Sequence, residues 1–318
     1  MQKDDFYVPS EVNIDNINAL SKEQSVLFEK RICELSELSD GAADLAAELI
    51  DSGFGIYELL GLISEGMSFS SPEPHESSLP RNAFILKNQL LSLSSHDKAV
   101  FSSLFTERLR KIGNGVSEAD FLSDGSGDSG IVYVKNRLAD EAYDVFAEGI
   151  PEATVAYAET LREAAEAVAD GKREYAILPL EEKGGARLAG IAALLFKYDL
   201  KIASVTPVFG FDGSADVKYA LVSKHFKIPP IAEDDDRYLE IRLRADRAMS
   251  LSSLFFAAEM LGASVYRINT VRFESEEGEF PYYTIVFKDE GSDFSELLVF
   301  LTLFAGYYTA IGIYKNLE

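Results

Sequence analysis

The feature that most constrains the fold of this chain is the order of hydrophobic patterns over residues 237–318. Apolar runs with strand periodicity predict four strands, at residues 238–244, 264–273, 282–288 and 307–314. Apolar residues at three- and four-residue spacing predict two helices, at residues 251–261 and 294–304. The acidic residues 274–279, which include Gly278, are typical of a hairpin turn between the two central strands. The resulting element order is βαββαβ.

A βαββαβ order is typical of the ferredoxin-like split βαβ fold. With this order, residues 237–318 most resemble an ACT domain, the amino-acid-sensing unit of many metabolic enzymes. The resemblance implies a homodimer, formed through this module by pairing of sheets edge to edge or by packing of helices.

The amino-terminal residues 1–115 are predicted to be helical. One buried helical face is predicted from the spacing of Val26, Leu27, Phe28, Ile32, Leu35 and Leu38. Asp40 stands where the N-cap of a separate helix over residues 42–50 is expected, and residues 53–55 (Gly-Phe-Gly) interrupt the pattern. Further helices are predicted at residues 56–63, 84–91 and 98–112, the last with Ser95 or Asp97 as its cap. Residues 68–80, rich in Ser and Pro, predict a loop.

Strands and helices alternate between two predicted linkers, residues 116–130 and 228–236. The predicted strands are residues 131–134, 154–157, 175–178 (ended by Pro179), 201–205 and 218–222, and the helices are residues 140–147, 161–169 and 188–197. Such alternation predicts a mostly parallel sheet with helices packed on it. The sequence thus predicts three units: a helical domain (1–115), an α/β lobe (131–227) and the ferredoxin-like module (237–318).

The middle unit carries a second resemblance. Residues 161–195 run from a helix through Ala176-Ile177-Leu178-Pro179-Leu180-Glu181 into another helix. This stretch resembles the first lobe of prephenate dehydratases, in which an ACT domain follows directly. In bifunctional members a helical chorismate mutase domain precedes both, and residues 27–31 and 81–110 resemble its helices. The implied fold class is a multidomain α and α+β protein with an N-terminal helical domain, a single α/β lobe and a C-terminal ACT-like domain.

The lobe also departs from that family. No counterpart of its glycine-rich loop lies between Val134 and Glu141, and only residues 206–216 stand where the family has a second lobe. The resemblance implies five weak catalytic candidates. Glu181, Glu182 and Lys183 stand where the family has Glu-Asn-Ser. Lys218 and Tyr219 stand where the family has the last two residues of its Thr-Arg-Phe motif. Val217 occupies the position of the threonine and has no proton to donate as a general acid. The sequence therefore predicts that dehydration of prephenate is inefficient.

The chorismate mutase resemblance implies a pocket of cations around a dicarboxylate, because charge stabilisation in a dry pocket carries that rearrangement. The cations available in the helical unit are Arg31, Arg81, Lys87, Arg108 and Lys111. Acidic residues lie beside them, and solvated cations on helix surfaces are the alternative interpretation.

The ACT resemblance implies a ligand site made by two short motifs. In that family the motif Gly-Ala/Ser-Leu opens the first helix, and Met249, Ser250 and Leu251 correspond to it here. The motif Glu-Ser-Arg-Pro on the following strand corresponds to residues 269–272. The resemblance therefore adds Asn269, Thr270 and Arg272 as ligand-binding residues. Methionine in place of glycine makes close approach of the backbone to a ligand less easy. The helix N-terminus still offers backbone amides to a carboxylate. A purely structural or dimerising role is the alternative.

Several classes of function are disfavoured by composition. Cys33 is the only cysteine, so neither an internal disulfide nor a multi-cysteine metal site is expected, and His75, His96 and His225 are too scattered for a metal site. A formal net charge of −23 argues against binding nucleic acid or an anionic membrane. No apolar stretch of about 18 residues and no secretory leader are found, which predicts a cytosolic protein. No cofactor is expected.

The function predicted from these residues is the binding or sensing of a small aromatic amino acid or metabolite, linked to phenylalanine biosynthesis, by a degenerate dehydratase–ACT protein. One alternative is a divergent but active prephenate dehydratase or chorismate mutase. The other is a non-catalytic dimeric scaffold.

Overall fold

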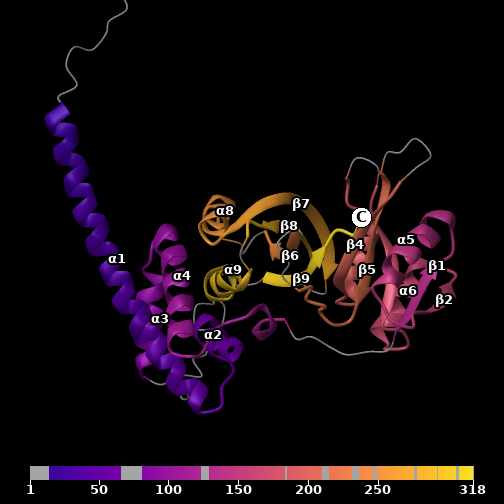
Figure 1. The fold of residues 1–318 in the computed structure, drawn as a ribbon, viewed down its shortest axis with the longest axis horizontal. Helices are drawn as coiled ribbons and strands as arrows, with labels where there is room; N and C mark the ends of the chain where they lie inside the picture. The colour runs from indigo at the N-terminus through magenta and orange to yellow at the C-terminus, as the bar shows by residue number, and fades with distance from the viewer. Residues whose placement is uncertain are drawn as a thin grey trace, which may run out of the picture.

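The computed structural model describes residues 14–65, 81–122, 129–182, 185–209, 215–230, 236–245, 249–275, 278–291, 293–305 and 308–317. Within these ranges the chain is a mixed α/β protein with N-terminal helices, a mixed five-stranded sheet and an antiparallel four-stranded sheet (Figure 1). The loop predicted at residues 68–80 lies outside the described residues, as do residues 123–128 and 231–235 of the two predicted linkers.

Four helices make up the N-terminal part: α1 (Ile14–Asp51), α2 (Ile56–Glu65), α3 (Arg81–Leu91) and α4 (Ser95–Lys111). The predicted helix start at Asp40 is wrong, because α1 continues through this residue and the Asp40 carboxylate instead pairs with Arg108 Nε of α4 at 2.6 Å. The interruption after α1 is confirmed, and Gly53 there has a φ of 94°, which favours glycine. The cap of α4 is Ser94, whose Oγ accepts a hydrogen bond from Asp97 N, so the predicted caps were wrong by one and three residues.

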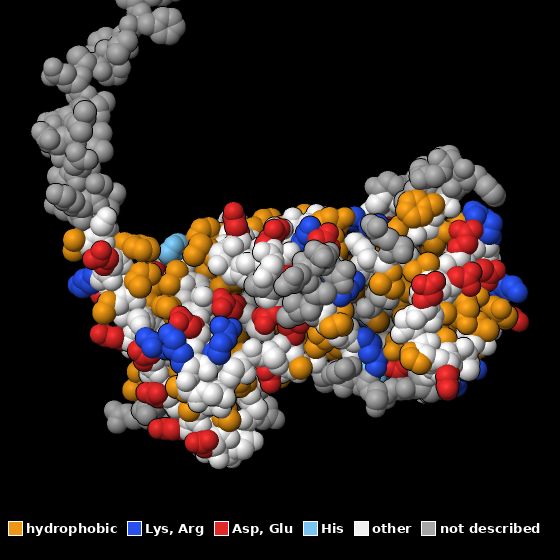
Figure 2. All heavy atoms as spheres, viewed as in Figure 1, with side chains coloured by type: hydrophobic (Ala, Val, Ile, Leu, Met, Phe, Trp, Pro, Cys, Tyr) orange, Lys and Arg blue, Asp and Glu red, His pale blue; other side chains and the backbone are white. Residues whose placement is uncertain are grey.

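The predicted buried face of α1 is only partly correct. Leu35 is buried, whereas Val26, Leu27 and Phe28 are 63%, 66% and 57% exposed. The reason is visible in Figure 1, where the N-terminal part of α1 extends past the ends of α3 and α4. Hydrophobic side chains lie at the surface of this extension in Figure 2.

The five-stranded sheet has the strand order β2-β1-β3-β5-β4. Its elements are β1 (Gly130–Val134), α5 (Arg137–Glu148), β2 (Thr154–Ala158), α6 (Leu161–Ala169), β3 (Tyr175–Glu182), α7 (Ala189–Lys197), β4 (Lys201–Phe209) and β5 (Ala215–Ser223). Strand β1 pairs in parallel with β2 and β3, but β5 is antiparallel to both β3 and β4. Strands β1–β4 therefore share one direction and β5 is reversed, so the prediction of a mostly parallel sheet holds for strand direction, although only two of the four neighbouring pairs are parallel. Only residues 210–214 join β4 to β5, and a parallel crossover needs a dozen residues or more.

Strand β3 runs through Pro179 to Glu182, so the prediction that Pro179 ends it is wrong. The register with β5 shifts between Pro179 and Glu181. A bulge tolerates proline because the ladder is already interrupted there. After the bulge, Glu181 pairs with Lys218 and Glu182 with Val217 of β5. Glu181 therefore shares a face of the sheet with Lys218.

The C-terminal elements are β6 (Arg237–Arg244), α8 (Leu251–Met260), β7 (Ala263–Ser275), β8 (Gly278–Asp289), α9 (Ser295–Phe300) with a π-helical turn η2 (Leu301–Ala305), and β9 (Tyr308–Lys315). The strand order is β7-β8-β6-β9 and every neighbouring pair is antiparallel. The predicted βαββαβ order is confirmed. The predicted turn falls between β7 and β8, with residues 276–277 outside the described part.

Hydrophobic packing crosses the predicted unit boundaries. The cluster formed by α1–α4 includes Val299 of α9 and Leu303 of η2. The cluster between the second sheet and its helices includes Ala99 of α4. A third cluster joins the first sheet to residues of the second sheet such as Val286 and Tyr314. The division into three units stays a prediction about the sequence, while the buried core is shared among them.

Candidate functional site

The two sheets meet where their edge strands β9 and β4 cross, and a parallel bridge joins Val205 to Asn316 there. Leu317 N donates a hydrogen bond to Val205 O at 2.7 Å, and Thr206 Oγ1 donates to Leu317 O at 3.0 Å. Gly312 of β9 lies so close to β4 that an added Cβ would be 2.2 Å from Ile202 O. Backbone therefore packs on backbone at this crossing, and the polar residues beside it are shut away from water.

A buried ion pair lies next to the crossing. Arg187, on the segment between β3 and α7, donates from Nη2 to Glu240 Oε2 of β6 at 2.6 Å. The two side chains are only 4% and 1% exposed. Tyr314 of β9 donates from its hydroxyl to the same carboxylate oxygen at 3.0 Å, and burial raises the pKa of Tyr314 well above its ordinary value. Tyr314 therefore stays neutral and acts as a donor.

A second pair joins the sheets through Glu181. Arg267 of β7 donates from Nη1 to Glu181 Oε1 and also to Gly185 O at 3.2 Å. The hydrogen bond to Glu181 raises the pKa of Arg267, so the guanidinium keeps its charge. Lys218 Nζ of β5 lies 4.0 Å from Glu181 Oε2. Glu181 is thus held between a cation of each sheet.

The space left in this interface is small. A cleft of about 10 Å³ is lined by Leu180, Glu181, Val205, Lys218, Tyr238, Tyr266, Arg267, Val286, Tyr314 and Asn316. That is room for about one water molecule. Glu181 Oε2, which borders the cleft, is buried without a hydrogen-bond partner among the described residues, and so are Nε and Nη1 of Arg187. This cleft has no room for a metabolite.

The structure brings together two of the catalytic candidates and separates the rest. Glu181 and Lys218 both face the second sheet, as described above. Tyr219, the next residue of β5, faces the opposite side, as strand alternation requires, and burial raises its pKa. Glu182 is exposed, and Lys183 lies outside the described residues. The four candidates that the structure describes therefore do not converge on one site.

The predicted ligand residues of the module fall on both faces of the second sheet. Asn269 pairs with Thr284 and Thr284 with Arg242, so all three share one face. The Arg242 guanidinium lies 4.4 Å from the centre of the Phe196 ring of α7, which identifies this face as the one turned to the lobe. Asn269 therefore lies on the opposite side of the sheet from α8.

The other predicted residues lie on the side of α8. Thr270 pairs with Tyr283, which packs against the α8-covered core, and both Thr270 and Arg272 are exposed. Ser250 caps α8, accepting from Ser253 N at 3.2 Å. Met249 and Leu251 are half-buried against the same core. Arg244, the last residue of β6, pairs with Tyr282 of β8, and Tyr282 pairs with Val271 of β7. The chain continues from Arg244 to α8. The start of α8 and the last residues of β7 therefore lie at the same end of this face.

The helices of the N-terminal part reach this end too. Ser253 Oγ of α8 donates to Ser95 Oγ of α4 at 3.0 Å. The His96 ring lies 5.5 Å from the Phe256 ring, centre to centre. The first turns of α4 and α8 are therefore neighbours, a contact that no pattern in the sequence indicated.

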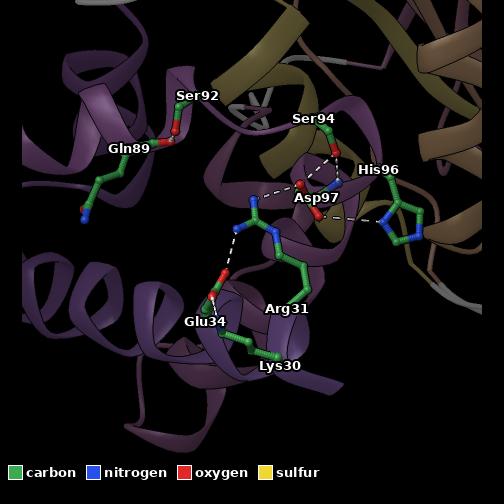
Figure 3. A network of polar contacts seen from close by, with 8 residues as sticks. All are labelled: Lys30, Arg31, Glu34, Gln89, Ser92, Ser94, His96 and Asp97. Carbon is green, nitrogen blue, oxygen red and sulfur yellow. Dashed lines mark hydrogen bonds and ion pairs between the residues drawn. The ribbon is translucent and has the colours of Figure 1, made fainter. Parts of the chain in front are cut away.

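The N-terminal cations do not form the pocket that the mutase resemblance implied. Arg31 pairs with Glu34 and Asp97, each at 2.9 Å (Figure 3), and Arg108 pairs with Asp40. Lys111 pairs with Glu107. The Arg81 side chain lies outside the described part, and Lys87 is half-exposed. A groove between α1 and α3 is lined instead by carboxylates (Glu34, Glu37, Asp44 and Glu48), which would repel a dicarboxylate.

The Arg31–Asp97 pair in Figure 3 gives a pH-dependent prediction. The hydrogen bond from Arg31 lowers the pKa of Asp97, so the pair stabilises the fold above pH of about 4 and this stabilisation is lost as pH falls through the folded-state pKa. We expect Asp97→Asn to lower the free energy of unfolding by about 1 kcal/mol at pH 7, since Arg31 is partly exposed. The difference between the two proteins in urea titrations should shrink as the pH falls through the folded-state pKa of Asp97. Glu34→Gln, at the exposed partner, should change stability less, and an equal loss would contradict this ranking.

The residues that complete the buried interface were not found from the sequence. Glu240 and Arg242 alternate with Leu239, Ile241 and Leu243, a pattern typical of a strand with one face in water. Arg187 and Arg267 belong to no recognisable motif. The burial of that face by another sheet is a tertiary effect that periodicity does not encode.

The fold and this interface define a mixed α/β protein whose antiparallel ferredoxin-like sheet is packed on a small α/β lobe. No family model and no curated protein sequence matches the chain. Among solved structures, a prephenate dehydratase from Streptococcus mutans is similar at 16% identity and a TM-score of 0.46, covering 59% of this chain and 99% of that one. A structure described as GqqA, a novel type of quorum quenching acylases, has 18% identity and a TM-score of 0.44 over 59% and 96% of the chains.

A prephenate dehydratase from Arthrobacter aurescens in complex with L-Phe has 12% identity and a TM-score of 0.43, over 58% of this chain and 89% of that one. The chain is thus distantly similar in fold to these proteins. At such identities and scores the likeness concerns the path of the chain and carries no functional assignment. None of the described helices combines the length and the apolar character needed to cross a membrane. The described residues contain no group of three or more His, Cys, Asp or Glu side chains arranged to hold a metal ion.

Proposed function

We propose that this chain binds a small aromatic amino acid or a related metabolite at its ferredoxin-like module, as a degenerate dehydratase–ACT protein linked to phenylalanine biosynthesis. The observation that carries the proposal is the end of the module where α8 begins. The exposed cap Ser250 and the exposed Thr270 and Arg272 lie at the same end of the same face. A helix N-terminus and a guanidinium are both suited to a carboxylate.

The same proposal holds that efficient dehydration of prephenate does not take place in the lobe. Glu181 and Lys218, which correspond to family motif positions, are engaged with Arg267 of the module, and the cleft beside them has room for about one water. General acid catalysis needs a donor within hydrogen-bond reach of a bound substrate. Val217 supplies no such donor.

The test is a thermal-shift titration of the full chain with phenylalanine, tyrosine, tryptophan, prephenate and chorismate, with turnover assays on prephenate and chorismate in parallel. Ligand at a hundredfold excess over its dissociation constant should stabilise the folded state by about 2.7 kcal/mol. We expect an aromatic amino acid to give a shift without turnover, and Arg272→Met to remove it. Asn269→Ala, on the opposite face, is the matched control. A flat response to all five compounds would favour the scaffold, and turnover would overturn the proposal.

We further propose that the chain forms a homodimer through this module. Strand β7 is a 13-residue edge strand, and Tyr266 and Ile268 on it are exposed. An exposed edge of this length is a template for pairing with another strand. Light scattering coupled to gel filtration should give twice the chain mass of 35.1 kDa. A monomer at all concentrations would contradict the homodimer while leaving ligand binding to be judged by the thermal shifts.

A further inference from the structure

A groove of about 530 Å³ lies between α1 and α3 of the N-terminal helices. Its floor is formed by apolar or small residues: Leu38, Gly41, Ala42, Leu45, Ile85 and Leu86. Glu34 of α1 and Gln89 of α3, both labelled in Figure 3, stand on its two borders. The groove is open along α1 because Gly41 has no side chain, and a Cβ added there would meet no heavy atom within 4 Å.

The charge of the groove is of one sign. Glu34, Glu37, Asp44 and Glu48 line it, and no Lys or Arg does so among the described residues. Glu34 is paired with Arg31, but Glu37, Asp44 and Glu48 have no ion-pair partner in the described part of the chain. These three carboxylates therefore project a negative potential along an apolar channel, where a low-dielectric wall strengthens it.

No segment outside the described residues carries a cluster of basic residues that would complement the groove. Outside the described residues the sequence has only three Lys or Arg residues, Lys3, Lys183 and Arg247, each in a different segment. A second copy carries the same net charge of −23 and the same acidic groove, so like charges would oppose its docking here. The groove fits a partner of opposite charge.

We propose that this groove is a docking site for a basic amphipathic helix of a partner protein, with its apolar face on the floor and its Lys or Arg side chains against Glu37, Asp44 and Glu48. From Glu34 to Glu48 the groove follows α1 for about 21 Å, which matches a helix of about 15 residues. Helix-in-groove recognition of this kind uses apolar anchors at helical spacing and charged residues at the rim for orientation. The interaction is separate from ligand binding at the module.

The test uses a fluorescently labelled Leu–Lys peptide of about 15 residues with helical amphipathic spacing, and a scrambled peptide of the same composition, in anisotropy titrations with the full chain. Gly41→Trp should fill the groove and weaken binding by at least about tenfold, whereas Gly41→Ala should leave affinity unchanged. If Gly41→Trp lowers the melting temperature, the same binding measurement is made with Gly41→Leu, whose smaller side chain fills less of the groove.

Charge is tested separately. The triple variant Glu37→Gln, Asp44→Asn and Glu48→Gln should weaken binding by about tenfold and flatten its dependence on salt, since each exposed charge contact contributes modestly. The matched control removes the same charge from exposed positions elsewhere: Asp144→Asn, Glu148→Gln and Glu259→Gln. Three outcomes would each overturn the proposal and leave only non-specific attraction to an acidic protein. The scrambled peptide could bind with the same affinity as the amphipathic one, or both triple variants could weaken binding equally. The third is that the variant with a filled groove binds the peptide as well as the unchanged protein does.

Discussion

Gly312→Ala is expected to destabilise the protein strongly. The new Cβ would lie 2.2 Å from Ile202 O and 3.1 Å from Ile202 N, so β9 and β4 would have to separate. Both partners are backbone, which no rotamer change can move aside. Overpacking typically costs about 1–3 kcal/mol and occasionally more, and we expect at least about 3 kcal/mol here because the shift disturbs both sheets. Urea unfolding monitored by circular dichroism measures it.

The matched control is Gly190→Ala, on α7 of the same lobe, where an added Cβ would meet no heavy atom within 4 Å. Alanine in place of a helical glycine should raise the free energy of unfolding by up to about 1 kcal/mol. A loss of unfolding free energy at Gly312 together with a gain at Gly190 would show that the close approach of β9 to β4 causes the destabilisation. A loss below about 1 kcal/mol at Gly312 would mean that the sheets do not cross at this distance.

Arg187→Met is expected to give a loss of similar size. It would leave the Glu240 carboxylate buried beside Tyr314 without its cation, and removing one partner of a buried pair costs about 3–5 kcal/mol. Unfolding in urea at pH 7 measures the change. Arg137→Met, at the exposed pair with Glu141, should change stability by about 1 kcal/mol or less.

A double variant sharpens this experiment. Arg187→Met combined with Glu240→Leu removes both charges and should recover most of the stability lost in the single variant, since replacing a buried pair by apolar residues is often neutral. Failure to recover would show that Arg187 acts through something other than Glu240.

Local patterns predicted most of the elements because each of them is amphipathic by itself. The βαββαβ order followed from periodicity alone, as did the order of helices and strands from residue 130 to residue 223. The errors fall where distant residues decide. Asp40 stays inside α1 because Arg108 pairs with it, and Pro179 stays inside β3 because a bulge accommodates it. In both cases a local stop signal is overruled by a partner far away in the sequence.

The candidate site could be predicted only in part, for the same reason. Glu181 and Lys218 stood out through the motifs around them, and Ser250 through its place before a helix. Arg267 and Glu240 lie in strands whose alternation is typical of a solvent-facing side, and they are buried only because a second sheet covers them. The alignment of motifs also placed Asn269 beside Arg272, whereas strand geometry puts them on opposite faces.

Residues near the C-terminal end of the sequence complete the packing of helices and strands that precede them, and this has a consequence for folding during synthesis on the ribosome. Val205 of the lobe receives its hydrogen bond from Leu317, and the N-terminal helices close their core on Val299 and Leu303. Neither contact can form until the residues from Val299 onward have left the exit tunnel. At a translation rate of about 5–20 residues per second, the apolar faces of α1–α4 would wait for some ten seconds or longer without their cover. During that interval the nascent chain is a natural client for chaperones that hold exposed helices.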